Sequence, residues 1–233
     1  MRKLALSLCL SLIMALAVTC PARAEFAKGL KAYIDADYKT AFREISISAE
    51  AGNPYAQYFL GTMFYFGKHL PQDYPKALKW YFLAATQGEA GAQNNLGVMF
   101  KKGQGVIQDY GQALKYFRMS SAQGYANAQN NLGQLFYDGH GVAQNYENAA
   151  SWYRLAAKQG YADAQQNLGK LYANGQGVSQ DLTKAQMWFN IAIRNGADSS
   201  EARSSIEKKL SASQIGTAQK MARRCLDSGY LDC

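Results

Sequence analysis

The chain has 233 residues, of which 25 are Lys or Arg and 17 are Asp or Glu, so its formal net charge is +8. The charges are dispersed, without a run of five or more of one sign, which argues against nucleic acid as the partner. Beyond the N-terminal stretch no segment is long and apolar enough to cross a membrane, so we expect no integral membrane segment.

Residues 1–24 are predicted to be a cleavable secretory signal peptide. A short basic start precedes the uncharged apolar run Leu4–Val18, which is shorter than the roughly 20 residues that span a bilayer. Ala22 and Ala24 then supply small side chains at the two positions that a signal peptidase reads, which predicts cleavage after Ala24. We therefore expect a periplasmic or secreted protein.

The alternative interpretation of this stretch is a lipoprotein signal with Cys20 as the lipid-bearing residue. Such a signal needs Leu and two small residues before the cysteine, and Ala17-Val18-Thr19 stands there instead. Cleavage after Ala24 leaves 22 basic and 17 acidic residues, a net charge of +5. This modest excess favours solubility rather than a polyanionic partner.

Glycines recur every 36 residues, at Gly52, Gly88, Gly124, Gly160 and Gly196. A fixed period of this length indicates a helical solenoid, in which each repeat buries its apolar face against the next. We divide the chain into a degenerate first repeat at 25–52, four full repeats at 53–88, 89–124, 125–160 and 161–196, and C-terminal capping helices at 197–233. The predicted fold class is all-α, an α/α solenoid of antiparallel helix pairs.

The first repeat is expected to be a shortened helix pair. Asp37-Tyr38 aligns with Asp73-Tyr74 one period later, and a first helix around Phe26–Ile34 runs almost directly into Asp37 without a glycine loop. Terminal repeats are often atypical because one of their faces meets solvent.

Each full repeat is predicted to contain helix A, a glycine loop and helix B. In the second full repeat helix A covers Ala90–Lys102, where apolar residues follow a helical spacing. Gly103 can end that helix in a left-handed conformation. Asp109 is then placed to cap helix B, which runs to about Ala122. Its equivalents in the other repeats are Asp73, Asn145 and Asp181.

Small residues at one register of both helices predict close helix packing. Glycine within a helix costs about 1 kcal/mol relative to alanine, so its recurrence implies a close approach. The glycines are Gly61, Gly97, Gly133 and Gly169, and the alanines expected opposite them are Ala77, Ala113, Ala149 and Ala185. The aromatic pairs expected to fill the space between repeats are Trp80-Tyr81, Tyr116-Phe117, Trp152-Tyr153 and Trp188-Phe189.

The C-terminal segment is predicted to close the array with a more polar helix pair, Glu201–Leu210 and Ser213–Cys225, the second capped by Ser211 or Ser213. After signal cleavage the only cysteines are Cys225 and Cys233. An even pair in an exported chain predicts a disulfide. Two free thiols are the alternative, and we expect no metal site, because two cysteines without nearby histidines supply too few ligands.

The frame A-Q-x-N-L-G, then G-x-G-V-x-Q-D-Y, then W-Y and A-A-x-Q-G, resembles the Sel-1-like repeat family, a branch of the tetratricopeptide-type α/α solenoids. The resemblance covers Asn53–Gly196 strongly and Glu25–Gly52 weakly, with His69 in place of a loop glycine as one departure. It implies a non-enzymatic protein–protein interaction module or scaffold, often in bacterial envelopes. The implied partner is a protein or peptide, and no cofactor is expected.

Three asparagines in one register, Asn95, Asn131 and Asn167, are the first candidates for a binding surface on the concave wall built by the A helices. In the related tetratricopeptide repeats an asparagine at this place bonds the backbone of an extended peptide, and an amide has the donors and the acceptor for that task. The alternative interpretation is an internal asparagine that bonds a neighbouring helix.

Helical spacing places further residues on this wall, where they differ between repeats as a partner-specific surface would. An aromatic start followed by two lysines would suit an apolar and acidic peptide. The residues are Tyr58, Thr62, Tyr65 and Phe66, then Asn94, Val98, Lys101 and Lys102, then Asn130, Gln134, Tyr137 and Asp138, and finally Gln166, Lys170 and Asn174. Gln57, Gln93, Gln129 and Gln165 also recur, and we expect them to join adjacent repeats.

Catalytic signals are weak. His69 and His140 lie in loops of repeats that are not neighbours, and no nucleophile stands in a recognisable motif with a histidine and an acid. One alternative to the adaptor is a structural spacer that binds through its convex or terminal surfaces. Another is penicillin-binding or β-lactamase activity, as assigned to some exported family members that carry a cysteine pair in each repeat. The repeats of this chain contain no cysteine.

Overall fold

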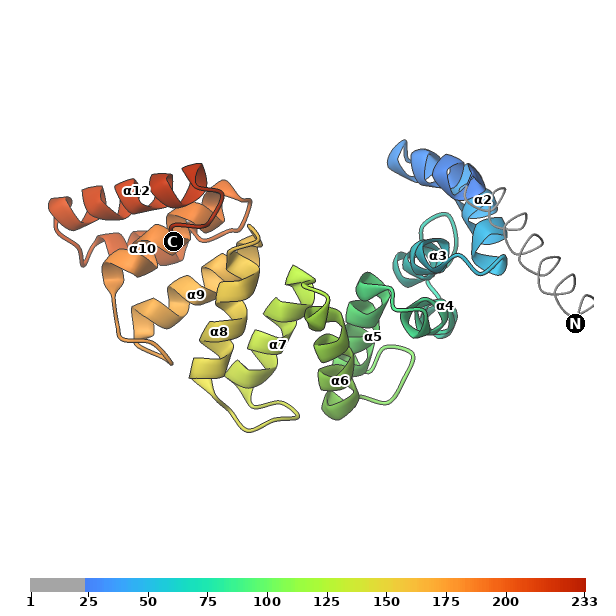
Figure 1. Ribbon diagram of the computed structural model, residues 1–233, viewed down its shortest axis with the longest axis horizontal. Coiled ribbons are helices and arrows are strands. Elements are labelled where there is room, and N and C mark those ends of the chain that lie inside the picture. Colours follow the sequence, from blue (N-terminus) through green and yellow to red (C-terminus); the bar gives the residue numbers. More distant parts are fainter. Residues whose placement is uncertain (1–23) are drawn as a thin grey trace, which may run out of the picture. The chain divides into compact units, whose positions relative to one another are not determined.

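The structure is a computed structural model that describes residues 24–233 (Figure 1). The predicted signal peptide lies outside the described residues except for Ala24. Within residues 24–233 every regular element is a helix, and consecutive helices pack as pairs, which confirms the all-α solenoid. The described chain up to Gln108 forms one compact unit, called here the N-terminal half, and Asp109–Cys233 forms the C-terminal half.

In the N-terminal half, residues 24–34 are helical and are followed by α2 (Tyr38–Glu50), α3 (Pro54–Phe66), α4 (Tyr74–Thr86) and α5 (Ala90–Lys102). The C-terminal half contains α6 (Tyr110–Ala122), α7 (Ala126–Asp138), α8 (Tyr146–Ala157), α9 (Ala162–Asn174), α10 (Leu182–Arg194), α11 (Ser200–Glu207) and α12 (Ala212–Asp227). The A helices are α3, α5, α7 and α9, and the B helices are α2, α4, α6, α8 and α10.

The predicted caps form the boundaries of these helices. The side chain of Asp73 accepts a hydrogen bond from the amide of Lys76 at 2.9 Å, and Asp109, Asn145 and Asp181 cap α6, α8 and α10 in the same way. Each A helix ends at a glycine in the left-handed region, such as Gly103 with φ 66°. His69 adopts φ 69° in the loop position that carries glycine in later repeats.

The helix glycines meet aromatic rings, which corrects the expected glycine–alanine contact. A Cβ atom on Gly61 would lie 2.7 Å from the ring of Tyr81, and one on Gly133 would lie 2.6 Å from Tyr153. Gly169 has the same relation to Phe189. The second aromatic of each of these pairs therefore packs inside its own repeat, since a ring brings more apolar surface to the glycine than an alanine methyl could.

The repeated glutamines join adjacent repeats, as predicted. Gln57 Nε2 donates to the carbonyl oxygen of Ala49 in the preceding B helix at 3.1 Å, and Gln57 Oε1 accepts from Gln87 Nε2 at 2.8 Å. In the C-terminal half Gln165 donates to Ala157 at 3.0 Å and accepts from Asn195 at 2.8 Å. These buried amides add a second hydrogen bond to carbonyl oxygens that already accept from the amides of Gly52 and Gly160.

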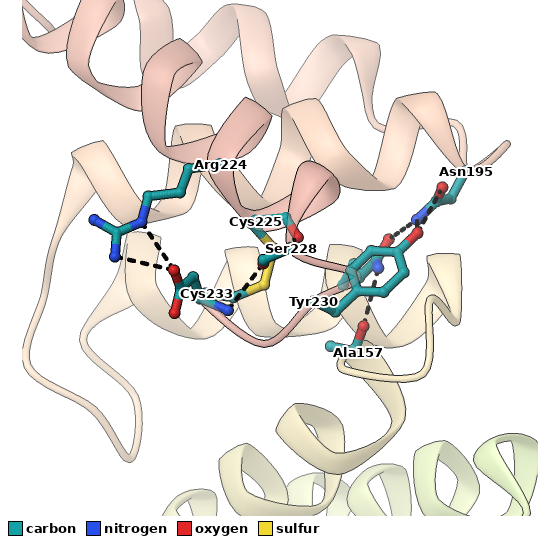
Figure 2. Close-up of a disulfide and its surroundings, with 9 residues drawn as sticks. Ala157, Asn195, Arg224, Cys225, Ser228, Tyr230 and Cys233 are labelled. Atoms are coloured by element: carbon teal, nitrogen blue, oxygen red, sulfur yellow. Dashed lines mark hydrogen bonds and ion pairs between the residues drawn. A yellow bond between two sulfur atoms is a disulfide. The ribbon is translucent and has the colours of Figure 1, made fainter.

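The C-terminal cap is held by a disulfide between Cys225 and Cys233, whose Cα atoms are 4.8 Å apart (Figure 2). The closed loop carries Tyr230, whose hydroxyl donates to Asn195 Oδ1 at 3.2 Å (Figure 2). This bond continues, at the C-terminal end, the series of hydrogen bonds made by the repeated glutamines, called here the glutamine ladder. Ser211, one of the two predicted caps, caps α12 in a capping box with Gln214. The preceding helix α11 ends at Glu207, three residues before its predicted end.

Among the described residues, none of the helices combines the length and the apolar character that crossing a membrane requires.

Candidate functional site

Four of the predicted wall residues surround one cavity in the C-terminal half. Gln134 and Tyr137 project from α7 and Asn167 and Lys170 from α9, and they line a cavity of about 130 Å³ together with Tyr153 of α8. Helical spacing predicts positions 134, 137 and 170 on this wall, because residues three and four apart share a helix face, and the repeated asparagine register predicts position 167.

Tyr153 forms the inner part of this cavity because Gly133 leaves room for its ring. Its hydroxyl donates to Gln134 Oε1 at 3.2 Å. Burial raises the pKa of Tyr153 well above its ordinary value, and the nearby carboxylate of Asp138 adds to the effect. The phenol therefore stays protonated and serves as a hydrogen-bond donor at every physiological pH.

Hydrogen bonds around the cavity orient its amide groups. Gln134 Nε2 donates to Asp138 Oδ2 at 2.9 Å, which fixes the direction of its oxygen toward Tyr153. Asn167 Nδ2 donates to Asn130 Oδ1 at 3.1 Å.

The cavity combines three kinds of groups that recognise a peptide. Asn167 Oδ1 can accept a backbone N–H, the rings of Tyr137 and Tyr153 provide apolar surface, and the exposed ammonium of Lys170 provides a positive charge. The lining residues include no carboxylate and no nucleophile that a base activates. The arrangement is therefore suited to binding a peptide.

In the N-terminal half the corresponding wall is packed with aromatic rings. The ring centroid of Tyr81 lies 6.0 Å from that of Tyr58 and 6.3 Å from that of Tyr65. The hydroxyl of Tyr65 donates to Gln104 Oε1 at 2.7 Å, and Tyr81 donates to Thr62 Oγ1 at 3.1 Å. These tyrosines therefore take part in the packing of this half.

The asparagines of the N-terminal half are likewise used internally. Asn94 is only 5% exposed, so it is not the open wall residue that helical spacing predicts. Its Nδ2 donates to Asn95 Oδ1 at 3.2 Å, and Asn95 is hydrogen-bonded to Tyr81 in the neighbouring helix α4. Lys101 is half-buried and Lys102 is exposed at the end of α5.

The asparagines at this register of the repeat therefore have different roles along the chain. Asn95 bonds a neighbouring helix, Asn131 is half-buried on α7, and Asn167 lines the cavity. Gln166 Nε2 of α9 donates to the carbonyl oxygen of Asp198 at 2.9 Å, so it contacts the segment just before α11.

Sequence reasoning missed Tyr153 as a cavity residue because it assigned this ring to the space between repeats. The available signal was Gly133, since a helix glycine in a fixed register implies a bulky neighbour in the same repeat. The histidines lie in loops, where His140 stacks on Tyr110 with ring centroids 4.4 Å apart. Within residues 24–233 no three side chains of His, Cys, Asp or Glu gather as a metal site would require.

The family model described as "Sel1 repeat" matches residues 54–89, 90–125, 126–161 and 162–196. These segments cover more than half of the chain and differ by one residue from the repeat boundaries expected from sequence. This chain belongs to the Sel1 repeat family. Sel1 repeat proteins are generally non-catalytic scaffolds for protein–protein interaction.

Solved structures of Sel1 repeat proteins are similar to this chain. A Sel1 repeat protein from Oxalobacter formigenes is 28% identical, with a TM-score of 0.67 over 86% of this chain and 73% of that protein. A protective antigen of uropathogenic Escherichia coli strains, c5321, is 29% identical, with a TM-score of 0.58 over 90% of this chain and 55% of its own length. A search of the curated proteins found no match.

Proposed function

We propose that this Sel1 repeat protein is a non-enzymatic adaptor that binds an extended segment of a partner protein at the cavity of the C-terminal half. The observation that carries this proposal is the set of Asn167, Lys170, Tyr137, Gln134 and Tyr153 around one cavity. An amide acceptor beside aromatic rings can bind a peptide backbone and one apolar side chain, as helical-repeat surfaces do. The positive charge of Lys170 favours a segment with an acidic residue next to the apolar one.

We further propose that the chain works outside the cytoplasm, in the periplasm or after secretion. The disulfide between Cys225 and Cys233 supports this location, because such bonds persist in oxidising compartments. The intact mass of the protein purified from its native cells tests the proposal. Cleavage after Ala24 gives a chain that begins at Glu25 and lacks two hydrogens relative to the reduced form, whereas an uncleaved chain would contradict export by this signal.

The binding proposal is tested with a photoreactive amino acid placed at Lys170 in the producing cell. Lys158 is the matched control, because it is also an exposed lysine of the C-terminal half but lies at the C-cap of α8, a B helix. We expect a crosslinked species of defined mass from position 170 and none from position 158. Replacing Asn167 by alanine should lower its yield at least tenfold while the helical content measured by circular dichroism is unchanged. Equal yields from both positions would refute the cavity as the binding site.

A further inference from the structure

The outer face of helix α10, formed by Met187, Asn190, Ile191 and Arg194, is covered by the C-terminal helix α12. These four residues are three and four apart and so share one side of the helix. Met187 is 2% exposed and Ile191 is fully buried, in one apolar cluster with Ala218, Ala222 and Cys225 of α12. Asn190 and Arg194 line a pocket together with residues of α12. In this chain the outer face of a B helix is therefore a place where a second helix docks.

The equivalent face of α4, three periods earlier, is formed by Lys79, Phe82, Leu83 and Thr86 and is open. Phe82 is 52% exposed and Leu83 is 37% exposed. Ile47, one period before Leu83 and in the same half, is 45% exposed on α2. Other B helices also expose an aliphatic residue in this register, Met119 and Leu155, but only α4 adds an aromatic ring beside it.

We propose that the outer face of α4 docks an amphipathic helix of a partner protein, whose apolar side is made of small residues flanked by acidic ones. This surface is distinct from the cavity proposed above for an extended segment. It takes the kind of element that α12 supplies to α10, at the same register of the repeat.

The size of the partner's apolar residues follows from the α10–α12 contact. α12 presents Ala218, Ala222 and Cys225 to the larger Met187 and Ile191. The side chain of Phe82 is larger than that of Asn190 at the equivalent position. A helix that packs on α4 therefore needs small side chains, such as alanine, at the contact.

The charge of the partner follows from the groups that face α4. Lys79 stands where α10 has Met187, and its ammonium lies 5.7 Å from the ring centroid of Trp80. Lys76 of the same helix already pairs with Asp73. An acidic residue in the partner helix can therefore pair with Lys79 without displacing an existing ion pair.

A second copy of this chain does not supply the occupant. The helix that packs in this way, α12, is already on α10 and carries Lys220, Arg223 and Arg224, which would meet Lys79 with like charge. Like charges placed together across an interface disfavour association.

The test uses two synthetic peptides with the sequence of residues 211–228 and Cys225→Ala, each held helical by a hydrocarbon staple on its polar side. The acidic peptide also carries Lys220→Glu, Arg223→Glu and Arg224→Glu, whereas the basic peptide keeps the native residues at these three positions. Binding to the full chain is measured by fluorescence anisotropy. We expect the acidic peptide to bind at least tenfold more tightly than the basic one.

Variants of the full chain then locate the binding site. The double variant Phe82→Ser and Leu83→Ser should weaken the acidic peptide at least tenfold, whereas Leu155→Ser, a matched change at the same register of α8, should alter it less than twofold. Lys79→Glu should reverse the preference between the two peptides. Because all four side chains are exposed, circular dichroism should show an unchanged fold.

Three results would overturn the proposal. The first is failure of the acidic peptide to bind the wild-type chain, and the second is equal weakening by Leu155→Ser, which would indicate general stickiness. The third is a loss, in the Phe82 and Leu83 variant, of either binding to phosphatidylglycerol vesicles or concentration-dependent dimerisation. Such a loss would assign the face to a membrane surface or to a second copy instead.

Discussion

The two halves of the molecule share one repeat frame but have different A-helix surfaces. Tyr58 in the N-terminal half packs on Tyr81, and its ring lies 3.0 Å from the position of a Cβ on Gly91. The residues 72 positions later are Asn130 and Asp163. There Asn130 accepts a hydrogen bond from Asn167, beside the cavity of about 130 Å³. We therefore expect these two positions outside the invariant frame to decide whether the surface is filled by a ring or is hollow.

The largest effect should come from the aromatic rings that both halves share. Tyr81→Ala and Tyr153→Ala each remove a buried ring from a helix glycine, at a cost of about 3–5 kcal/mol in the free energy of unfolding. Urea unfolding followed by circular dichroism measures this loss. Tyr→Phe at either position keeps the ring and should retain most of the stability. A severe loss at only one of the two positions would contradict the shared packing.

The next effect should come from the glutamine ladder, which is also common to both halves. Gln57→Ala and Gln165→Ala each remove two hydrogen bonds, one to a backbone carbonyl that also accepts from a glycine amide and one to a side-chain amide, at a cost of about 1–2 kcal/mol. Gln219→Ala, at an exposed position of α12, is the control and should change the stability by less than about 0.5 kcal/mol. Losses in Gln57→Ala and Gln165→Ala no larger than in this control would show that water replaces the ladder.

Exchanging the two deciding residues tests the difference between the halves directly. Asn130→Tyr combined with Asp163→Gly should place a ring over the C-terminal cavity and reduce crosslinking from position 170 at least tenfold. The reverse change, Tyr58→Asn, should cost only about 1–2 kcal/mol, because Tyr58 is half-buried. Unchanged crosslinking in a folded double variant would show that these two residues do not decide whether the cavity is open.

The smallest effect concerns acid and belongs to the N-terminal half. Hydrogen bonds from Lys28 and Arg43 lower the pKa of Glu44 below its ordinary value. Because the folded pKa is the lower one, this stabilisation is complete above the unfolded value of about 4.3 and is lost as the pH falls through the folded value. Glu44→Gln should therefore flatten the decline in melting temperature below about pH 4. An unchanged decline would show that other carboxylates dominate.

Much of the fold could be predicted because each of its devices lies within a few residues. The caps at Asp73 and Asp109 and the glycine at Gly103 were predicted from local backbone chemistry, and the structure has them. Predictions failed where two helices meet. The neighbour of Gly61 is a ring rather than an alanine, and Asn94 is buried although its spacing places it on the open wall.

The sequence by itself determined the repeat and the caps and glycines that bound the helices within it. It did so because a period of 36 residues and a helical turn are properties of the chain's own order. Only the tertiary structure decided that Tyr153 completes a cavity, that Asn95 is used internally, that α12 covers α10, and that Phe82 of α4 is exposed. These outcomes depend on side-chain volume and direction between helices, which no spacing along one helix specifies.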